Sequence, residues 1–173
     1  MRADKAAVFA PVAITLGSAS AMAQDAPPVE VTPYVALGTA ASSPVGVVVT
    51  FPVTSIFSVE TDVAYRRGEG DIHALSTSTS LLYSLPRVGH STPYVAAGVG
   101  LAQYGAPVFS ASGRAIGTQP RLTMTVNAGA GLKTPVNDAV DLRTDARWSK
   151  SFGHQGSEQF RVAQGVSFDI RKR

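Results

Sequence analysis

The sequence predicts an all-β fold in which eight antiparallel strands follow one another up and down around a barrel. Three observations lead to this prediction. From residue 30 onward, apolar and polar residues alternate with period two, the period of a strand with one buried face. Turn residues divide this stretch into eight segments. The connections alternate between short turns with proline and longer loops rich in glycine and serine, as in an antiparallel meander.

The expected strands, in order, are residues 30–38, 44–52, 56–67, 71–85, 92–104, 119–133, 138–150 and 157–170. The seventh segment contains "DLRTDARW", in which Asp141, Arg143, Asp145 and Arg147 occupy every second position. In a helix, like charges would lie four residues apart on one face, which is unfavourable. We therefore expect a strand with one charged and one apolar face.

The N-terminus is typical of a secretory signal peptide. Arg2 and Lys5 precede an apolar run, and small residues lead up to Ala23. We expect residues 1–23 to be the signal peptide, although a cut after Ala21 would also fit, followed by a short lead-in at 24–29 and the barrel at 30–173. A buried helix is the alternative, but Pro11 interrupts the run.

Composition excludes several classes of protein. The chain has 173 residues, no cysteine, three histidines and a formal net charge of +3. Its length suits one domain with a sizeable interior. We expect no disulfide, metal site or cofactor, because cysteine is absent and no nucleotide motif is present. The charge is too small and too scattered to predict nucleic-acid binding.

The two faces of the strands distinguish a membrane barrel from a soluble one. A soluble barrel turns its apolar face inward, whereas a membrane barrel turns it toward lipid. Seven large aromatic residues lie at the ends of the apolar face, as in the aromatic girdles of membrane barrels. Those beside the short turns are Phe51, Phe57, Tyr83 and Phe168, and those beside the longer loops are Tyr65, Trp148 and Phe160.

The polar face carries five acids and six bases, a near balance that suits an enclosed network of ion pairs. They are Glu60, Asp62, Arg66, Arg121, Lys133, Asp141, Arg143, Asp145, Arg147, Arg161 and Asp169. The prediction is an eight-stranded antiparallel up-and-down transmembrane β-barrel with a charged lumen. A soluble periplasmic barrel with an apolar pocket is the competing interpretation.

Glycines on this face should make room for long side chains. If the sixth and seventh strands pair across "TPVND", Lys133 lies opposite Asp141 and Gly131 opposite Arg143, with the register free to slip by two. Relief of curvature in a tight barrel is an equally good reason for the glycines.

"TPYVAAGVGLAQYG" (Thr92 to Gly105), the turns with proline and the closing strand "FRVAQGVSFDI" resemble the small eight-stranded outer-membrane barrels of Gram-negative bacteria. That family includes the membrane domain of outer membrane protein A, outer membrane protein X and many surface-antigen or "porin family" proteins. The resemblance implies a protein of the bacterial outer membrane that contacts lipid and lipopolysaccharide and is inserted by the barrel assembly machinery. We expect a monomer, although the sequence leaves the oligomeric state open. The chain departs from the family in that "RKR" follows the closing strand.

We expect a non-enzymatic protein that presents loops at the cell surface, the longest from Tyr104 to Gln119. Arg67, Arg114 and Lys150 are candidates for contact with lipopolysaccharide phosphates, unless they are ordinary solvated charges. A small-solute channel is one alternative. A lipid A deacylase is another, but the three histidines, His73, His90 and His154, form no His-x-Ser pattern.

Overall fold

The computed structural model describes residues 28–39, 43–67, 73–109, 111–112, 115–152 and 157–170. The predicted signal peptide, Arg114, His154 and the final "RKR" lie outside these residues. None of the described residues forms a helix with the length and apolarity needed to cross a membrane.

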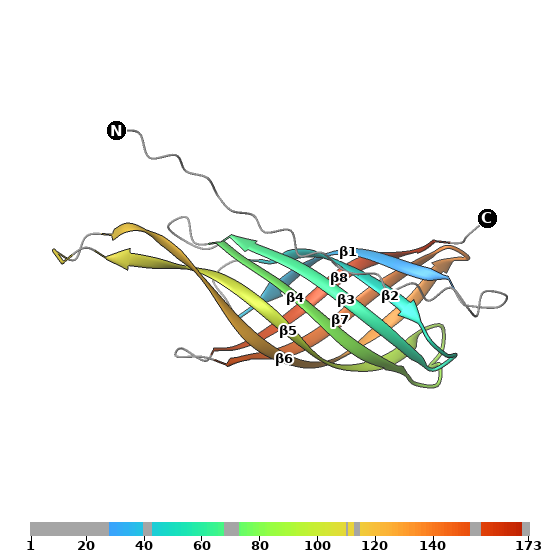
Figure 1. Ribbon diagram of the computed structural model, residues 1–173. Coiled ribbons are helices and arrows are strands. Elements are labelled where there is room, and N and C mark those ends of the chain that lie inside the picture. Colours follow the sequence, from blue (N-terminus) through green and yellow to red (C-terminus); the bar gives the residue numbers. More distant parts are fainter. Residues whose placement is uncertain are drawn as a thin grey trace.

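Eight antiparallel strands form a closed barrel, in which each strand pairs with the next along the chain and the last pairs with the first (Figure 1). They are β1 (Val29–Gly38), β2 (Val45–Pro52), β3 (Phe57–Arg67), β4 (His73–Ser84), β5 (Thr92–Phe109), β6 (Ala115–Asn137), β7 (Val140–Phe152) and β8 (Glu158–Ile170). The predicted fold class is confirmed. Closure pairs the first strand with the last and leaves the barrel without an open edge.

The strands begin and end within two residues of their predicted bounds, with two exceptions: β5 and β6 continue toward each other, and β6 also runs to Asn137, four residues past its predicted end. The expected loop from Tyr104 to Gln119 is mostly a two-stranded ribbon. β4 stops pairing with β5 at Tyr104, and β7 stops pairing with β6 at Met124, so the ribbon projects beyond the barrel wall (Figure 1). The glycine and serine content of this segment predicted a loop, but β5 and β6 keep pairing with each other as far as Phe109 and Ala115.

The apolar face of the strands points outward and the polar face points into the barrel. Val35 and Val99 have 62% and 60% of their surface exposed, whereas Glu60 is fully buried. This is the opposite of a soluble barrel, whose core would be apolar. Around a membrane barrel, lipid replaces water, so an exposed apolar band on the outer surface is expected for such a barrel.

The turn between β6 and β7 is tighter than expected and changes their register by two residues. Lys133 lies opposite Arg143, and Gly131 lies opposite Asp145. The strands are joined by the two-residue turn 138–139, in which the Asn137 side chain accepts a hydrogen bond of 2.9 Å from the Ala139 amide. Because the shift is an even number of residues, every side chain keeps its predicted face.

A charge placed on the outward face would test whether this face meets lipid. We expect Val99→Arg, at the middle of β5, to lower the free energy of unfolding in phospholipid vesicles by about 2–4 kcal/mol, because the guanidinium would lie in hydrocarbon. The measurement is a denaturant titration of the vesicle-inserted protein. Val88→Arg, in the exposed turn before β5, is the control and should change the stability little. Equal stability of the two variants would contradict a lipid-facing β5.

Candidate functional site

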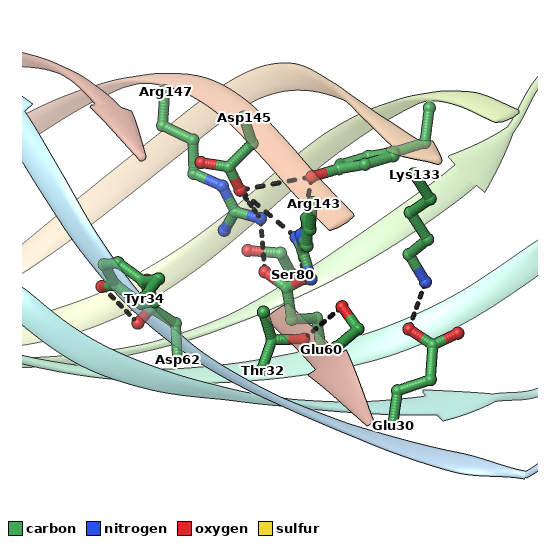
Figure 2. Close-up of polar contacts among 12 residues, drawn as sticks. Glu30, Thr32, Tyr34, Glu60, Asp62, Ser80, Lys133, Arg143, Asp145 and Arg147 are labelled. Carbon is green, nitrogen blue, oxygen red and sulfur yellow. Dashed lines mark hydrogen bonds and ion pairs between the residues drawn. The ribbon is translucent and has the colours of Figure 1, made fainter. Parts of the chain in front are cut away.

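A cluster of four ionised side chains fills the middle of the barrel (Figure 2). Glu60 on β3 accepts hydrogen bonds from Arg143, at 2.5 Å, and from Arg147, both on β7. Asp145 lies between the two arginines, with its carboxylate 3.2 Å from Arg143 and 3.3 Å from Arg147. All four are buried. Two positive and two negative charges therefore compensate one another where water cannot solvate them.

This cluster bridges opposite walls of the barrel. β3 and β7 are four strands apart in a ring of eight, so the pairs from Glu60 to Arg143 and Arg147 cross the lumen. Alternation along β7 places Arg143, Asp145 and Arg147 on one face within five residues. The local sequence of β7 thus points both arginines into the lumen, and closure of the barrel brings Glu60 on β3 within reach of them.

A buried tyrosine completes the cluster. The Arg143 Nε atom donates a 2.8 Å hydrogen bond to the Tyr94 hydroxyl, which donates in turn to Asp145 at 3.3 Å. The Arg143 guanidinium carbon lies 4.9 Å from the centre of the Tyr94 ring, within range of a cation–π interaction. Tyr94 therefore serves as acceptor, donor and aromatic surface at once.

The same arrangement recurs nearer the loop side. The Tyr34 hydroxyl donates to Asp62 at 2.8 Å and accepts from Arg161 at 2.6 Å, while Arg161 also pairs with Asp62. The Arg161 guanidinium carbon again lies 4.9 Å from the ring centre. Two tyrosine–acid–arginine groups thus occupy the narrow interior.

Glycine makes room for these rings. Tyr34 pairs across strands with Gly46, and Tyr94 pairs with Gly131. A Cβ atom on either glycine would overlap its tyrosine ring. Gly129 lies opposite Arg147, whose Cγ would be 2.7 Å from such an atom. The glycines therefore make room for long side chains, as expected. Because of the register shift, the side chains that use this room are Arg147 and Tyr94 instead of Arg143.

The other predicted lumen charges lie toward the two ends. At the turn side, Lys133 pairs with Glu30, which sequence reasoning missed, and half-buried Asp141 interacts electrostatically with both. Asp169 is half-buried at the same end, opposite Glu30. At the loop side, Arg66 donates a 3.2 Å hydrogen bond to Gln159.

Arg121 differs from the prediction. It is exposed, and it lies on the part of β6 that pairs with β5 alone. The inward face of a strand encloses a lumen only where the barrel is closed. At Arg121 the β5–β6 ribbon has already left the closed barrel, because β6 pairs with β7 only from Met124 onward.

Sequence reasoning also missed Tyr34 and Tyr94. The signal was available, because alternation places Tyr34 with Thr32 and Tyr94 with Ala96 on the inward face. Alternation alone does not show that a narrow lumen has space for large rings, because the glycines opposite them are set by the register between strands.

The predicted girdle residues all lie on the outward face, where Phe51 is half-buried and the other six are exposed. Phe57 and Tyr83 pack at 5.2 Å between ring centres beside the short turns. Trp148 and Phe160 are cross-strand partners at the loop side. Phe152, which we did not assign to the girdle, is also exposed near that end.

The candidates for lipopolysaccharide contact lie at the loop side. Arg67 is exposed at the end of β3. Lys150 forms a 3.0 Å ion pair with Glu158, so part of its charge is already compensated. Arg114 is outside the described residues.

Neither of the two histidines in the described part of the chain, His73 and His90, forms a hydrogen bond with a serine there. His73 Nδ1 lies 2.6 Å from the Tyr65 hydroxyl at the outer rim, and His90 is exposed in the turn before β5. Within the described part of the chain, no group of three or more histidine, aspartate or glutamate residues could hold a metal ion.

Removing one buried hydroxyl would test whether the tyrosine is part of the network. We expect Tyr94→Phe to lower the free energy of unfolding by about 1–3 kcal/mol, because the Arg143 Nε donor would lose its acceptor. Tyr83→Phe, on the outward face, makes the same chemical change and should cost about 0.5 kcal/mol or less. Both are measured by denaturant unfolding in detergent. Similar losses for the two variants would show that the Tyr94 hydroxyl adds nothing specific.

No protein-family model and no curated protein matches the chain. Solved structures do match. The N-terminal β-barrel domain of OprF from Pseudomonas aeruginosa is 18% identical, with 85% of this chain and 100% of that one covered and a TM-score of 0.66. Neisserial surface protein A is 12% identical, with 82% and 96% covered and a TM-score of 0.65. The outer membrane enzyme PagL is 17% identical, with 82% and 99% covered and a TM-score of 0.51. The chain therefore has the fold of the small eight-stranded outer-membrane β-barrels, the group that its sequence resembles.

Proposed function

We propose that this chain is a non-enzymatic protein of the bacterial outer membrane whose lumen is closed by its own side chains and whose β5–β6 ribbon is presented at the cell surface. The observation that carries the proposal is the pairing of Glu60 with Arg143 and Arg147 across the lumen. Its role would be in envelope structure or in surface interaction, with lipid and lipopolysaccharide as its surroundings and the barrel assembly machinery as its route of insertion.

The cluster supports a closed lumen because opening a path would separate buried charges. Breaking a buried pair leaves an uncompensated charge, which costs about 3–5 kcal/mol. Between the two tyrosine–acid–arginine groups, a void of about 10 Å³ is lined by Tyr34, Arg143, Asp145 and Arg161. Such a void is at the lower limit for a single water molecule. A small-solute channel through this interior is therefore the weaker proposal.

An enzyme is the second alternative, since PagL shares the fold. A lipid hydrolase of the kind considered would need a histidine that activates a serine, with an acid to orient it. His73 is engaged with Tyr65, and His90 lies at the short-turn end, away from the projecting ribbon. Release of fatty acid from lipid A by the purified protein would revive this alternative.

Surface presentation rests on the projecting ribbon and on charges near the loop side. Exposed Arg67 and partly compensated Lys150 lie at the loop-side ends of their strands, so in the proposed orientation they would face lipopolysaccharide phosphates in the outer leaflet. Arginine suits such groups because its guanidinium can donate two parallel hydrogen bonds to a phosphate.

The closed lumen predicts low conductance. In planar lipid bilayers we expect no stable pores on the nanosiemens scale, because the cross-lumen pairs obstruct the path of hydrated ions. A variant in which Glu60, Arg143 and Arg147 are all alanine should conduct more. Its folding is checked by electrophoresis, in which a folded barrel migrates differently before and after boiling. Large, stable pores in the unaltered protein would refute the closed lumen.

The orientation can be tested by labelling, because the chain contains no natural cysteine. We expect Ala111→Cys, at the tip of the ribbon, to react with a membrane-impermeant maleimide on intact cells. Val88→Cys, exposed in the turn before β5, should react only after the outer membrane is permeabilised. The reverse pattern would place the ribbon in the periplasm.

A further inference from the structure

A cavity of about 100 Å³ lies in the lumen between the charge clusters and the loop-side ends of the strands. Its lining includes Arg147, Arg161 and Asp62 from the clusters. Gly38 and Pro44, beside the β1–β2 connection, also line it, so the cavity reaches the loop side. The proposed function makes no use of this space.

Two buried residues in the lining have hydrogen-bond donors without a protein acceptor among the described residues. Arg147 is only 3% exposed, and its Nε and Nη1 atoms lack partners, although Nη2 pairs with Glu60. Asn127 is 9% exposed; its Oδ1 accepts a 3.0 Å hydrogen bond from Ser80, but its Nδ2 has no partner. Buried donors without acceptors are unfavourable. They indicate a need for an acceptor in the cavity.

The charge of the lining also favours an acceptor that is negative. Arg66, Arg147 and Arg161 all line the cavity, and Asp62 is the only carboxylate in the described lining. Arg147 is compensated by Glu60 and Asp145, and Arg161 by Asp62, so the excess positive charge in the lining is that of Arg66, which donates to the neutral Gln159. Asp62 is already occupied by Arg161 and by the Tyr34 hydroxyl. The carboxylates of the central cluster do not line this space.

We propose that this cavity binds a small oxyanion, with inorganic phosphate as the representative ligand. Its volume suits a tetrahedral anion or a few water molecules. Guanidinium groups donate charge-assisted hydrogen bonds to such oxygens, and hydroxyls of Ser149 and Ser151 in the lining can complete the shell. The ligand chemistry is a phosphate-type oxyanion, whether free in solution or carried on lipopolysaccharide.

Two arginines supply a matched pair of variants. Arg66 is half-buried and lines the cavity, whereas Arg87 is exposed in the turn before β5, at the opposite end of the barrel, and is not part of the lining. Arg66→Gln and Arg87→Gln remove the same charge at the two ends. Calorimetric titration of the detergent-folded protein with inorganic phosphate, in a chloride background, should show saturable binding. We expect Arg66→Gln to weaken it by about five- to tenfold and Arg87→Gln to leave it unchanged.

Asn127→Asp is a second test, because it keeps the acceptor for Ser80 and replaces the free donor with a negative charge. It should abolish phosphate binding while the boiled and unboiled electrophoretic mobilities remain distinct. Competition by purified lipopolysaccharide would identify a lipid-borne phosphate, and its absence a free anion; both outcomes support the site. Lack of saturable binding by the unaltered protein, equal weakening by the two arginine variants, or undiminished binding by Asn127→Asp would overturn the proposal.

Discussion

The pairing of Glu60 with Arg143 and Arg147 is the constraint on which the interior depends. These side chains come from opposite walls of the barrel and meet in a space without bulk water. A charge in such a place is tolerated only if it is compensated and hydrogen-bonded. The positions of Asp145, which balances the second arginine, and of Tyr94, which satisfies Arg143 Nε, follow from that requirement.

The width of the barrel imposes the second constraint. Eight strands enclose just enough room for side chains, so a large ring on one strand needs a small neighbour on the next. Tyr94 opposite Gly131 and Tyr34 opposite Gly46 meet this condition. The two tyrosines then hold Arg143 and Arg161 by stacking as well as by hydrogen bonds. The glycines therefore contribute to the charge network indirectly, because they leave the space that the tyrosines need to contact the arginines.

The filled and the open parts of the lumen differ in what they can do. Around Glu60 the charges compensate one another, which supports a structural role for this part. Toward the loop side, Arg66 and the free donors of Arg147 face a cavity with an excess of positive charge. The proposed closed barrel and the proposed anion site therefore concern different regions, and neither requires the other.

The sequence by itself determined the fold class, the approximate bounds of most strands and the inward face of ten of the eleven predicted lumen charges. It could do so because strand periodicity is local, and an even shift in register does not change which way a side chain points. Glu60 and Arg143 were thus assigned to the lumen without knowledge of their distance. Arg121 was misplaced because alternation along a strand carries no information about where the barrel ends.

Only the tertiary structure decided which charges pair. The tight β6–β7 turn shifted Arg147 onto Gly129, and closure brought β3 across from β7. It also joined Lys133 to Glu30, residues 103 positions apart in the chain. Such partners depend on register and barrel closure together, and both are set by the sum of contacts around the ring, which no single segment contains.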